Sequence, residues 1–362
     1  MIKLNLALAC SVGALVALMQ ASPVAAQQAI NLTVAAGQPL RAVPQLEMVS
    51  TYFIPEVNKR MAASGLDKKY KINWREAYAG SLLKPTMVLE GVRDGIADIG
   101  FEPTIFHPDK LPLEQISFMA PFLTSDVPLV TRGVNRLHKD IPAYKAQYEK
   151  FGVVRLAGVS SDDFALFTTF PVTKFEDITG RRISTAGAAL QWLRGTPATP
   201  VQSNMTLYYN NTQTGVVDGF IIFLTSIPGM KYPEVAPYVT RVGFGAHYAS
   251  ALIINRDVYN RLPAEVRAIV QQVADDWSEI ADKNQNALAD KAFASVKTFN
   301  KGTLHTLSRE EQEKWANAMP NIAKEWASRL DKQGLPGTKA LGLYMQEMRG
   351  AGIKPVRDWD KK

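Results

Sequence analysis

Short apolar runs alternate with helical stretches along this chain, and this alternation limits the folds open to it more than any other feature. The runs at 31–36, 72–77 and 96–101 are typical of strands, and helical periodicity covers 43–62 and 84–93. Strands separated by helices at this spacing favour a parallel sheet covered by helices. We therefore predict an α/β fold.

A second unit of the same kind follows downstream. A second set of strands is predicted at 153–156, 164–168, 182–185 and 219–224, with helices at 188–194 and 205–214. The sequences GIAD at 95–98 and GVVD at 215–218 each follow a helical stretch and lead into an apolar strand. In both, Gly suits a left-handed helix end and Asp suits the turn before a strand. We expect the chain to build the α/β unit twice.

The longest helical pattern covers residues 263–300, where apolar residues recur every three or four positions after Pro263. A single helix of this length would extend about 55 Å, which is more than the width of one domain. We therefore expect it to bridge two lobes. A second helix is predicted from Ser308, where Glu311 completes a capping box, to about residue 330.

The first 26 residues have the pattern of a cleavable secretory signal. Lys3 precedes an apolar run at 6–19, and the sequence VAA at 24–26 fits a cleavage site. The alternative is a membrane anchor, but the run is shorter than the roughly 20 residues that a span needs. We expect a mature chain that starts near Gln27 and is located in the periplasm.

Composition excludes several function classes. The formal net charge is +7, but Lys and Arg are scattered, so nothing indicates nucleic-acid binding. Cys10, in the leader, is the one cysteine, which excludes an internal disulfide scaffold. No catalytic or nucleotide-binding motif occurs, and the four histidines lie far apart in sequence, at His107, His138, His247 and His305. We expect neither a metal nor a cofactor.

Several motifs resemble the extracytoplasmic solute-binding proteins of tripartite ATP-independent periplasmic (TRAP) transporters, the DctP type. The sequence YNNTQTGVVDG at 209–219 is similar to the family's Y-x-x-L-Q-x-G-V-V-D-G. Supporting pieces follow the family's order: AGSL at 79–82, EGVRDGIADIG at 90–100, PFL at 121–123 and DITGRRI at 177–183. Together they cover nearly the whole chain, and the combination is specific.

The resemblance implies a two-lobed periplasmic binding protein with a central ligand cleft, hinge strands and a long bridging helix. Its partners would be a small organic ligand, typically an organic acid, and the membrane permease subunits, and we expect a monomer. We assign residues 27–155 with about 241–285 to lobe I and 156–240 with about 286–345 to lobe II. Residues 1–26 are the signal and 346–362 a tail. Two other functions stay open, an exported enzyme on a lobed scaffold and a ligand sensor subunit.

The chain departs from the family where a ligand carboxylate would be bound. In the family, the arginine of G-x-K-x-R makes a bidentate pair with the carboxylate, but Ser184 occupies that position here. At two further places where family members carry polar or charged residues, this chain has Ala165 and the apolar run FIIF at 220–223. If the alignment slips, Arg182 or Arg194 takes the role, although strand alternation argues against Arg182. The ligand is then either uncharged and partly apolar or a carboxylate held by neutral donors.

Candidate ligand contacts follow from the rule that ligands bind outside the carboxyl ends of strands in open α/β sheets. This rule selects residues 74–78, 101–104, 184–187 and 220–223. Aromatic side chains there offer flat contact area to an apolar ligand. Our candidate ligand-binding residues are Trp74, Phe101, Ser184, Trp192, Tyr209 and Phe220. Glu102 at the cleft would instead favour a cationic or hydroxylated ligand.

Overall fold

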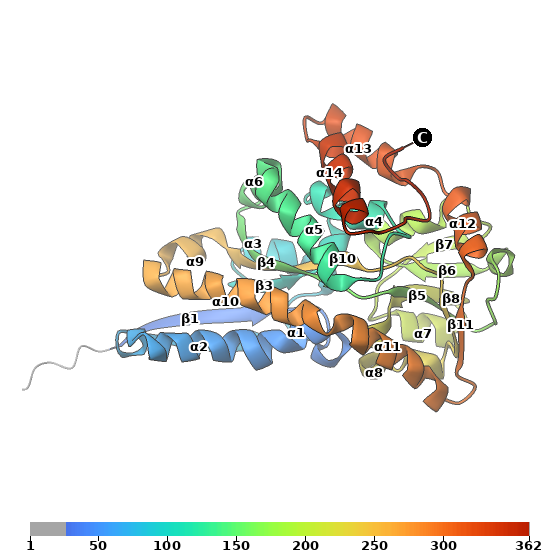
Figure 1. Ribbon diagram of the computed structural model, residues 1–362. Helices are drawn as coiled ribbons and strands as arrows, with labels where there is room; N and C mark the ends of the chain where they lie inside the picture. The colour runs from blue at the N-terminus through green and yellow to red at the C-terminus, as the bar shows by residue number, and fades with distance from the viewer. Residues whose placement is uncertain (1–26, 362) are drawn as a thin grey trace, which may run out of the picture.

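The structure, a computed structural model, describes residues 27–361 and contains two β-sheets surrounded by helices (Figure 1). The predicted signal at 1–26 lies outside the described residues. Among the residues described, no helix combines the length and the apolar character needed to cross a membrane.

The first sheet has the strand order β2-β1-β3-β10-β4. Strands β1, β2 and β3 are parallel, as predicted, whereas β10 runs antiparallel to both β3 and β4. Strands β4 and β10 have nine residues each and pair along their whole length, from His247 with Ser161 to Asn255 with Val153. The bounds are β1 Gln28–Ala35, β2 Tyr70–Ala77, β3 Ile99–Glu102, β4 Val153–Ser161 and β10 His247–Asn255.

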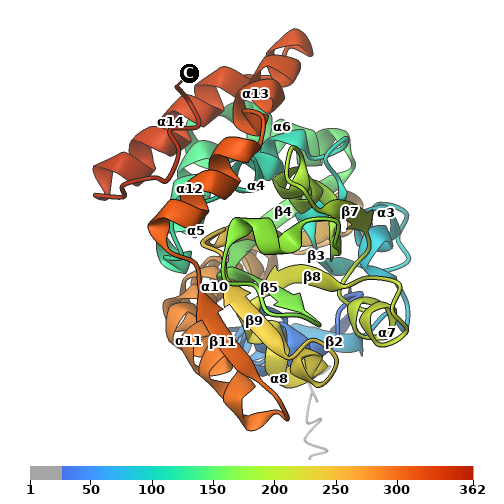
Figure 2. The same ribbon diagram turned by 90° about the vertical axis from the view of Figure 1, so that its right-hand side faces the viewer.

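The second sheet has the order β11-β9-β5-β8-β6-β7 and faces the viewer in Figure 2. Strands β6, β7 and β8 are parallel, and β5 runs antiparallel to β8 and to β9. The bounds of β5 and β6 agree with the sequence prediction to the residue; β5 is a compact apolar run, and β6 lies between Gly180 and Gly187. The bounds are β5 Phe164–Thr168, β6 Arg182–Thr185, β7 Thr199–Gln202, β8 Gly219–Phe223, β9 Tyr238–Arg241 and β11 Thr303–Thr306.

Helices cover both sheets. On the first sheet the predicted helix at 43–62 is confirmed as α1 and α2, joined by a π-helical turn at Val49–Phe53. The predicted helix at 188–194 is a 3₁₀-helix, Gly187–Leu193, not an α-helix. The bounds are α1 Pro44–Met48, α2 Ile54–Ala63, α3 Val88–Arg93, α4 Ile116–Met119, α5 Val127–Asp140, α6 Pro142–Lys150, α7 Tyr208–Gln213, α8 Ile227–Met230 and α9 Arg256–Arg261.

The prediction of a single bridging helix at 263–300 is wrong in one respect, because the segment forms two helices. Helix α10, Ala264–Lys283, lies beside the first sheet, and α11, Gln285–Ser295, continues beside the second (Figure 1). The break is at Asn284, whose φ of −109° and ψ of 3° depart from helical values. The pair still spans both sheets, as the length argument required.

The predicted C-terminal helix from Ser308 is also divided. Helix α12, Arg309–Ala318, ends before Pro320, and α13, Ile322–Lys332, and α14, Gly337–Gly350, follow. Ser308 caps α12 by accepting from the amide of Glu311, but the Glu311 carboxylate does not return the bond. The Glu311 carboxylate accepts instead from the backbone amide of Phe175 at 2.6 Å. This bond connects α12 to the segment between β5 and β6.

The chain crosses between the sheets three times: after β4 at Asp162-Asp163, between β9 and β10, and at Asn284. The first two crossings are bonded together, since the amide of Phe164 donates to the carbonyl of Gly245 at 3.0 Å. These positions agree with the predicted hinge strands. The assignment of whole segments to each lobe stays a prediction.

Candidate functional site

A small, mostly apolar cavity of about 60 Å³ lies between the two sheets. It is at the carboxyl ends of β3, β4, β6 and β8 and beside the antiparallel β10, which is the place where the strand-end rule puts a ligand. Residues from both sheets and their connections line it: Gln38, Val43, Pro85, Pro103, Ile105, Phe106, Ser161, Phe164, Thr185, Ala186, Met205, Tyr208, Ile221, Ile222, Phe223, Ala249 and Ser250.

Close contacts between the two lobes surround this cavity. A Cβ added to Gly187 would lie 2.1 Å from the carbonyl oxygen of Ile105, in the connection after β3. A Cβ added to Gly229 in α8 would lie 2.4 Å from the carbonyl oxygen of Arg41, in the connection after β1. No side chain larger than hydrogen fits at either point, so the lobes meet backbone to backbone in a closed conformation.

The polar groups of the cavity carry no formal charge. Ser161 and Ser250 come from the two paired strands, Thr185 from the end of β6, and Gln38 from the loop after β1. Gln38 is only 5% exposed, and its Oε1 has no hydrogen-bond partner among residues 27–361. A buried amide oxygen without a partner is costly, so Gln38 is a candidate for contact with a ligand.

The sequence model of the bacterial extracellular solute-binding proteins, family 7 (DctP), matches residues 58–329 of this chain. The chain belongs to this family. The DctP-type resemblance drawn from the motifs is confirmed, and with it the solute-binding role and the two-lobed α/β fold.

Relatives in this family bind different solutes. The chain is 24% identical over 276 residues to the C4-dicarboxylate-binding periplasmic protein DctP of Rhodobacter capsulatus, covering 69% of this chain and 83% of that one. It is 21% identical over 258 residues to the ectoine-binding periplasmic protein TeaA of Halomonas elongata, covering 70% and 75%. A TRAP solute-binding protein of Rhodoferax ferrireducens, solved with copurified benzoate, superimposes with a TM-score of 0.78 at 16% identity, covering 89% and 98%.

Ser184, expected from the sequence at the place of the family's arginine, and the two alternative arginines all bond to other groups of the protein. Ser184 is fully buried in β6, where its hydroxyl donates to the carbonyl of Val201 at 3.1 Å. The two alternative arginines are engaged elsewhere: Arg182 pairs with Asp218 at 2.9 Å, and Arg194 pairs with Glu325 at 2.7 Å. No Lys or Arg is among the described residues that line the cavity.

Three of the predicted ligand contacts are immediate chain neighbours of residues that line the cavity. Ser184 precedes Thr185, and Phe220 precedes Ile221. Tyr209 follows Tyr208, and its hydroxyl donates to Glu234 at 2.8 Å. The ring of Phe220 stacks on Tyr208, with centroids 4.8 Å apart, so it supports a lining residue from behind. None of these three is itself among the lining residues.

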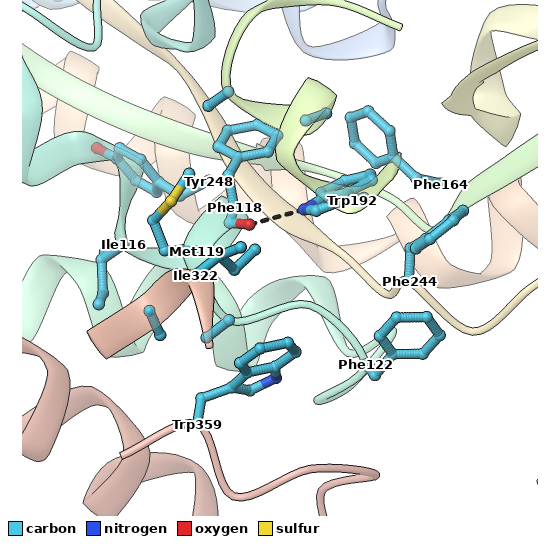
Figure 3. Close-up of a cluster of buried hydrophobic side chains, with 14 of the residues drawn as sticks. Ile116, Phe118, Met119, Phe122, Phe164, Trp192, Phe244, Tyr248, Ile322 and Trp359 are labelled. Atoms are coloured by element: carbon cyan, nitrogen blue, oxygen red, sulfur yellow. Dashed lines mark hydrogen bonds between the residues drawn. The ribbon is translucent and has the colours of Figure 1, made fainter. Parts of the chain in front are cut away.

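The other three predicted contacts lie in the packing of the lobes. Trp192 is fully buried and donates from Nε1 to the carbonyl of Phe118 at 2.7 Å; its ring stacks on Phe244 and meets Phe164 edge-on (Figure 3). Phe101 packs edge-on against Trp277 in α10. Trp74 lies on the outermost strand β2, and its Nε1 donates to Asn58 at 3.0 Å. The structure does not bring these side chains together.

Glu102, the acidic candidate for the cleft, is buried elsewhere. Its carboxylate lies 3.1 Å from Nε2 of His107 and is fully enclosed. Burial raises the pKa of Glu102, and the His107 ring opposes that rise. Glu102 therefore belongs to a buried pair and does not line the cavity.

Two adjacent carboxylates occupy the first crossing between the sheets. Asp162 Oδ1 accepts from the amides of Leu224 and Thr225 at 2.9 and 3.2 Å, and burial raises the pKa of Asp162 to about 7. Burial raises the pKa of Asp163 to about 6, although Arg241, 3.3 Å away, opposes the rise. These bonds fix the connection from β4 to β5.

Gln38 lines the cavity but was not among the predicted contacts. Gln38 follows the first predicted strand by two residues, so the strand-end rule that selected four other segments also applies to it. Thr185, Ala186 and Ile221 fell within the selected segments, but which of two neighbouring side chains faces the cavity depends on the other lobe.

Proposed function

We propose that the mature protein, starting near Gln27, is a periplasmic receptor that captures a small organic molecule between its lobes and delivers it to a TRAP membrane permease. The observation that carries this proposal is the cavity formed by strand ends of both sheets in a chain of this family. Its lining is mostly apolar, which favours a ligand with substantial apolar area.

The lobes must separate for a ligand to enter. The cavity is small, and backbone atoms of the two lobes meet at Gly187 and Gly229, so this closed conformation leaves little room for a solute to pass. The paired connections at Asp162-Asp163 and at Gly245 are the points where such a motion would bend the chain. Closure on a captured solute is the event that a permease would recognise.

Ligand screening by thermal shift tests this proposal on protein that has been unfolded and refolded to remove copurified molecules. A ligand at 100 times its dissociation constant adds about 2.7 kcal/mol to stability, which is easily detected. Small-angle scattering with the ligand should then show compaction. A screen of aromatic, aliphatic and amide compounds that gave no stabilisation, or a ligand that bound without compaction, would contradict the proposal.

A further inference from the structure

The chemistry of the cavity points to a ligand class. We propose that the part of the ligand enclosed here is uncharged and that the amide of Gln38 binds a neutral polar group on it, such as an amide, a lactam or a hydroxyl. This inference rests on the proposed function, which it deepens by excluding a carboxylate as the buried recognition group.

The first argument is electrostatic. A carboxylate moved out of water without a cation or several donors costs several kcal/mol, so a site for one needs compensation. The described residues that line the cavity include no cationic side chain. Lys84 precedes the lining residue Pro85 but is exposed to solvent. Arg241 is bound between Asp163 and Asp290, at 3.3 and 2.6 Å.

Backbone donors at the end of β8 are occupied as well. The short helix Leu224–Ser226 begins directly after the lining residue Phe223, and free amides at such a point would attract an anion. The amides of Leu224 and Thr225 instead donate to the carboxylate of Asp162. The carboxyl group of Asp162 therefore already occupies these two donors, and they are not available to an anionic ligand.

The second argument concerns Gln38. Its Oε1 is buried without a partner, while the same side chain lines the cavity. A primary amide offers one acceptor and two donors, so it pairs best with a group that both donates and accepts. Amides, lactams and hydroxyls do this, whereas a carboxylate only accepts. The hydroxyls of Ser161 and Ser250 have the same dual character.

Pairs of compounds that differ only in this group test the inference. We would titrate the refolded protein with benzamide and benzoate, phenylacetamide and phenylacetate, and succinamide and succinate, using calorimetry. The expected result is that the best-bound compound is an amide, with at least tenfold lower dissociation constant than its carboxylate. Tighter binding of the carboxylate would overturn the inference and leave the receptor function intact. Binding of no compound, together with failure of the wider screen, would overturn both.

A variant locates the recognition group. Gln38→Met keeps the length of the side chain but removes the amide, so it should weaken the best-bound amide at least tenfold and leave its carboxylate partner unchanged. Gln191→Met is the matched control, because Gln191 contacts Arg194 at the surface and does not line this cavity. Unchanged amide affinity in a folded Gln38→Met protein would overturn the role of Gln38.

Discussion

Ala186 lies directly after β6 and is one of the smallest side chains that line the cavity. Ala186→Leu would fill much of a space of about 60 Å³ with the protein's own atoms. We expect this change to weaken ligand binding at least about tenfold, because the added carbons take the space that the ligand would occupy, and to lower stability by no more than about 3 kcal/mol. Calorimetric titration measures the affinity and thermal unfolding the stability.

Ala63→Leu, at the exposed end of α2, is the control for this substitution and should leave binding unchanged. If Ala186→Leu bound the ligand as tightly as the natural protein, the ligand would have to lie outside this cavity.

Asp162 gives stability a pH dependence whose direction is fixed by its surroundings. Because burial raises its pKa to about 7, the folded protein holds a proton there that the unfolded chain, with an ordinary pKa near 3.8, has released. The contribution of this group to stability is therefore highest at low pH and falls as pH rises from about 4 to about 7.

The variant Asp162→Asn is uncharged and loses this dependence. At each pH we compare the free energy of unfolding of the variant with that of the natural protein. This difference should shift in favour of the variant by up to about 3 kcal/mol when the pH is raised from 5 to 8. Urea denaturation at both pH values measures the difference, with the exposed Asp109→Asn as the control for removing one carboxylate. An equal difference at the two pH values would show that Asp162 is ionised throughout.

The limits of sequence reasoning are clearest at single residues. Ser184 and Thr185 are neighbours on one strand, and their side chains point to opposite faces of the sheet. Ser184 and Thr185 are both buried, so neither composition nor periodicity tells which of the two side chains is directed toward the other lobe. Only the placement of both lobes shows that Thr185 lines the cavity. The missing charge was easier to predict, since it needed only the identity of Ser184.

Elements were predictable where local signals agree. The bounds of β5 follow from a compact apolar run, and β6 lies between Gly180 and Gly187. The apolar periodicity, in contrast, continues on both sides of the break between α10 and α11. Lys283, Asn284 and Gln285 are all compatible with a helix, and the chain turns there because α11 must pack on a second sheet. Tertiary contacts, not propensity, decide such a break.

The start of α12 provides a test at the scale of one element. Ser308→Ala removes the cap acceptor for the amide of Glu311 and should lower the free energy of unfolding by about 1 kcal/mol. Ser308→Asp keeps an acceptor and should retain most of the stability. Denaturant unfolding measures both. Equal destabilisation by the two variants would mean that the hydroxyl acts in some way other than as a cap.

Closure of the whole molecule depends on Gly229. Its added methyl group in Gly229→Ala would lie 2.4 Å from the carbonyl oxygen of Arg41 and 2.7 Å from Cα of Ala42, so the lobes cannot close fully. We expect ligand affinity to fall about tenfold or more, and small-angle scattering to show a less compact liganded state.

Gly342→Ala, in α14, has no atom within 4 Å of the added methyl group and serves as the control. It should bind ligand normally and gain some helix stability. Full compaction of the Gly229→Ala protein with ligand would mean that this contact yields without cost.

The bond between Phe164 and Gly245 joins the two strand connections at their crossing. Because the two connections are hydrogen-bonded to each other, they are expected to bend together and to resist twisting. In the opening motion proposed above, this bond would keep the two connections together, so that the lobes separate on the side away from it. A solute would then enter and leave on that side, and the proposed permease would have to dock over the same edge.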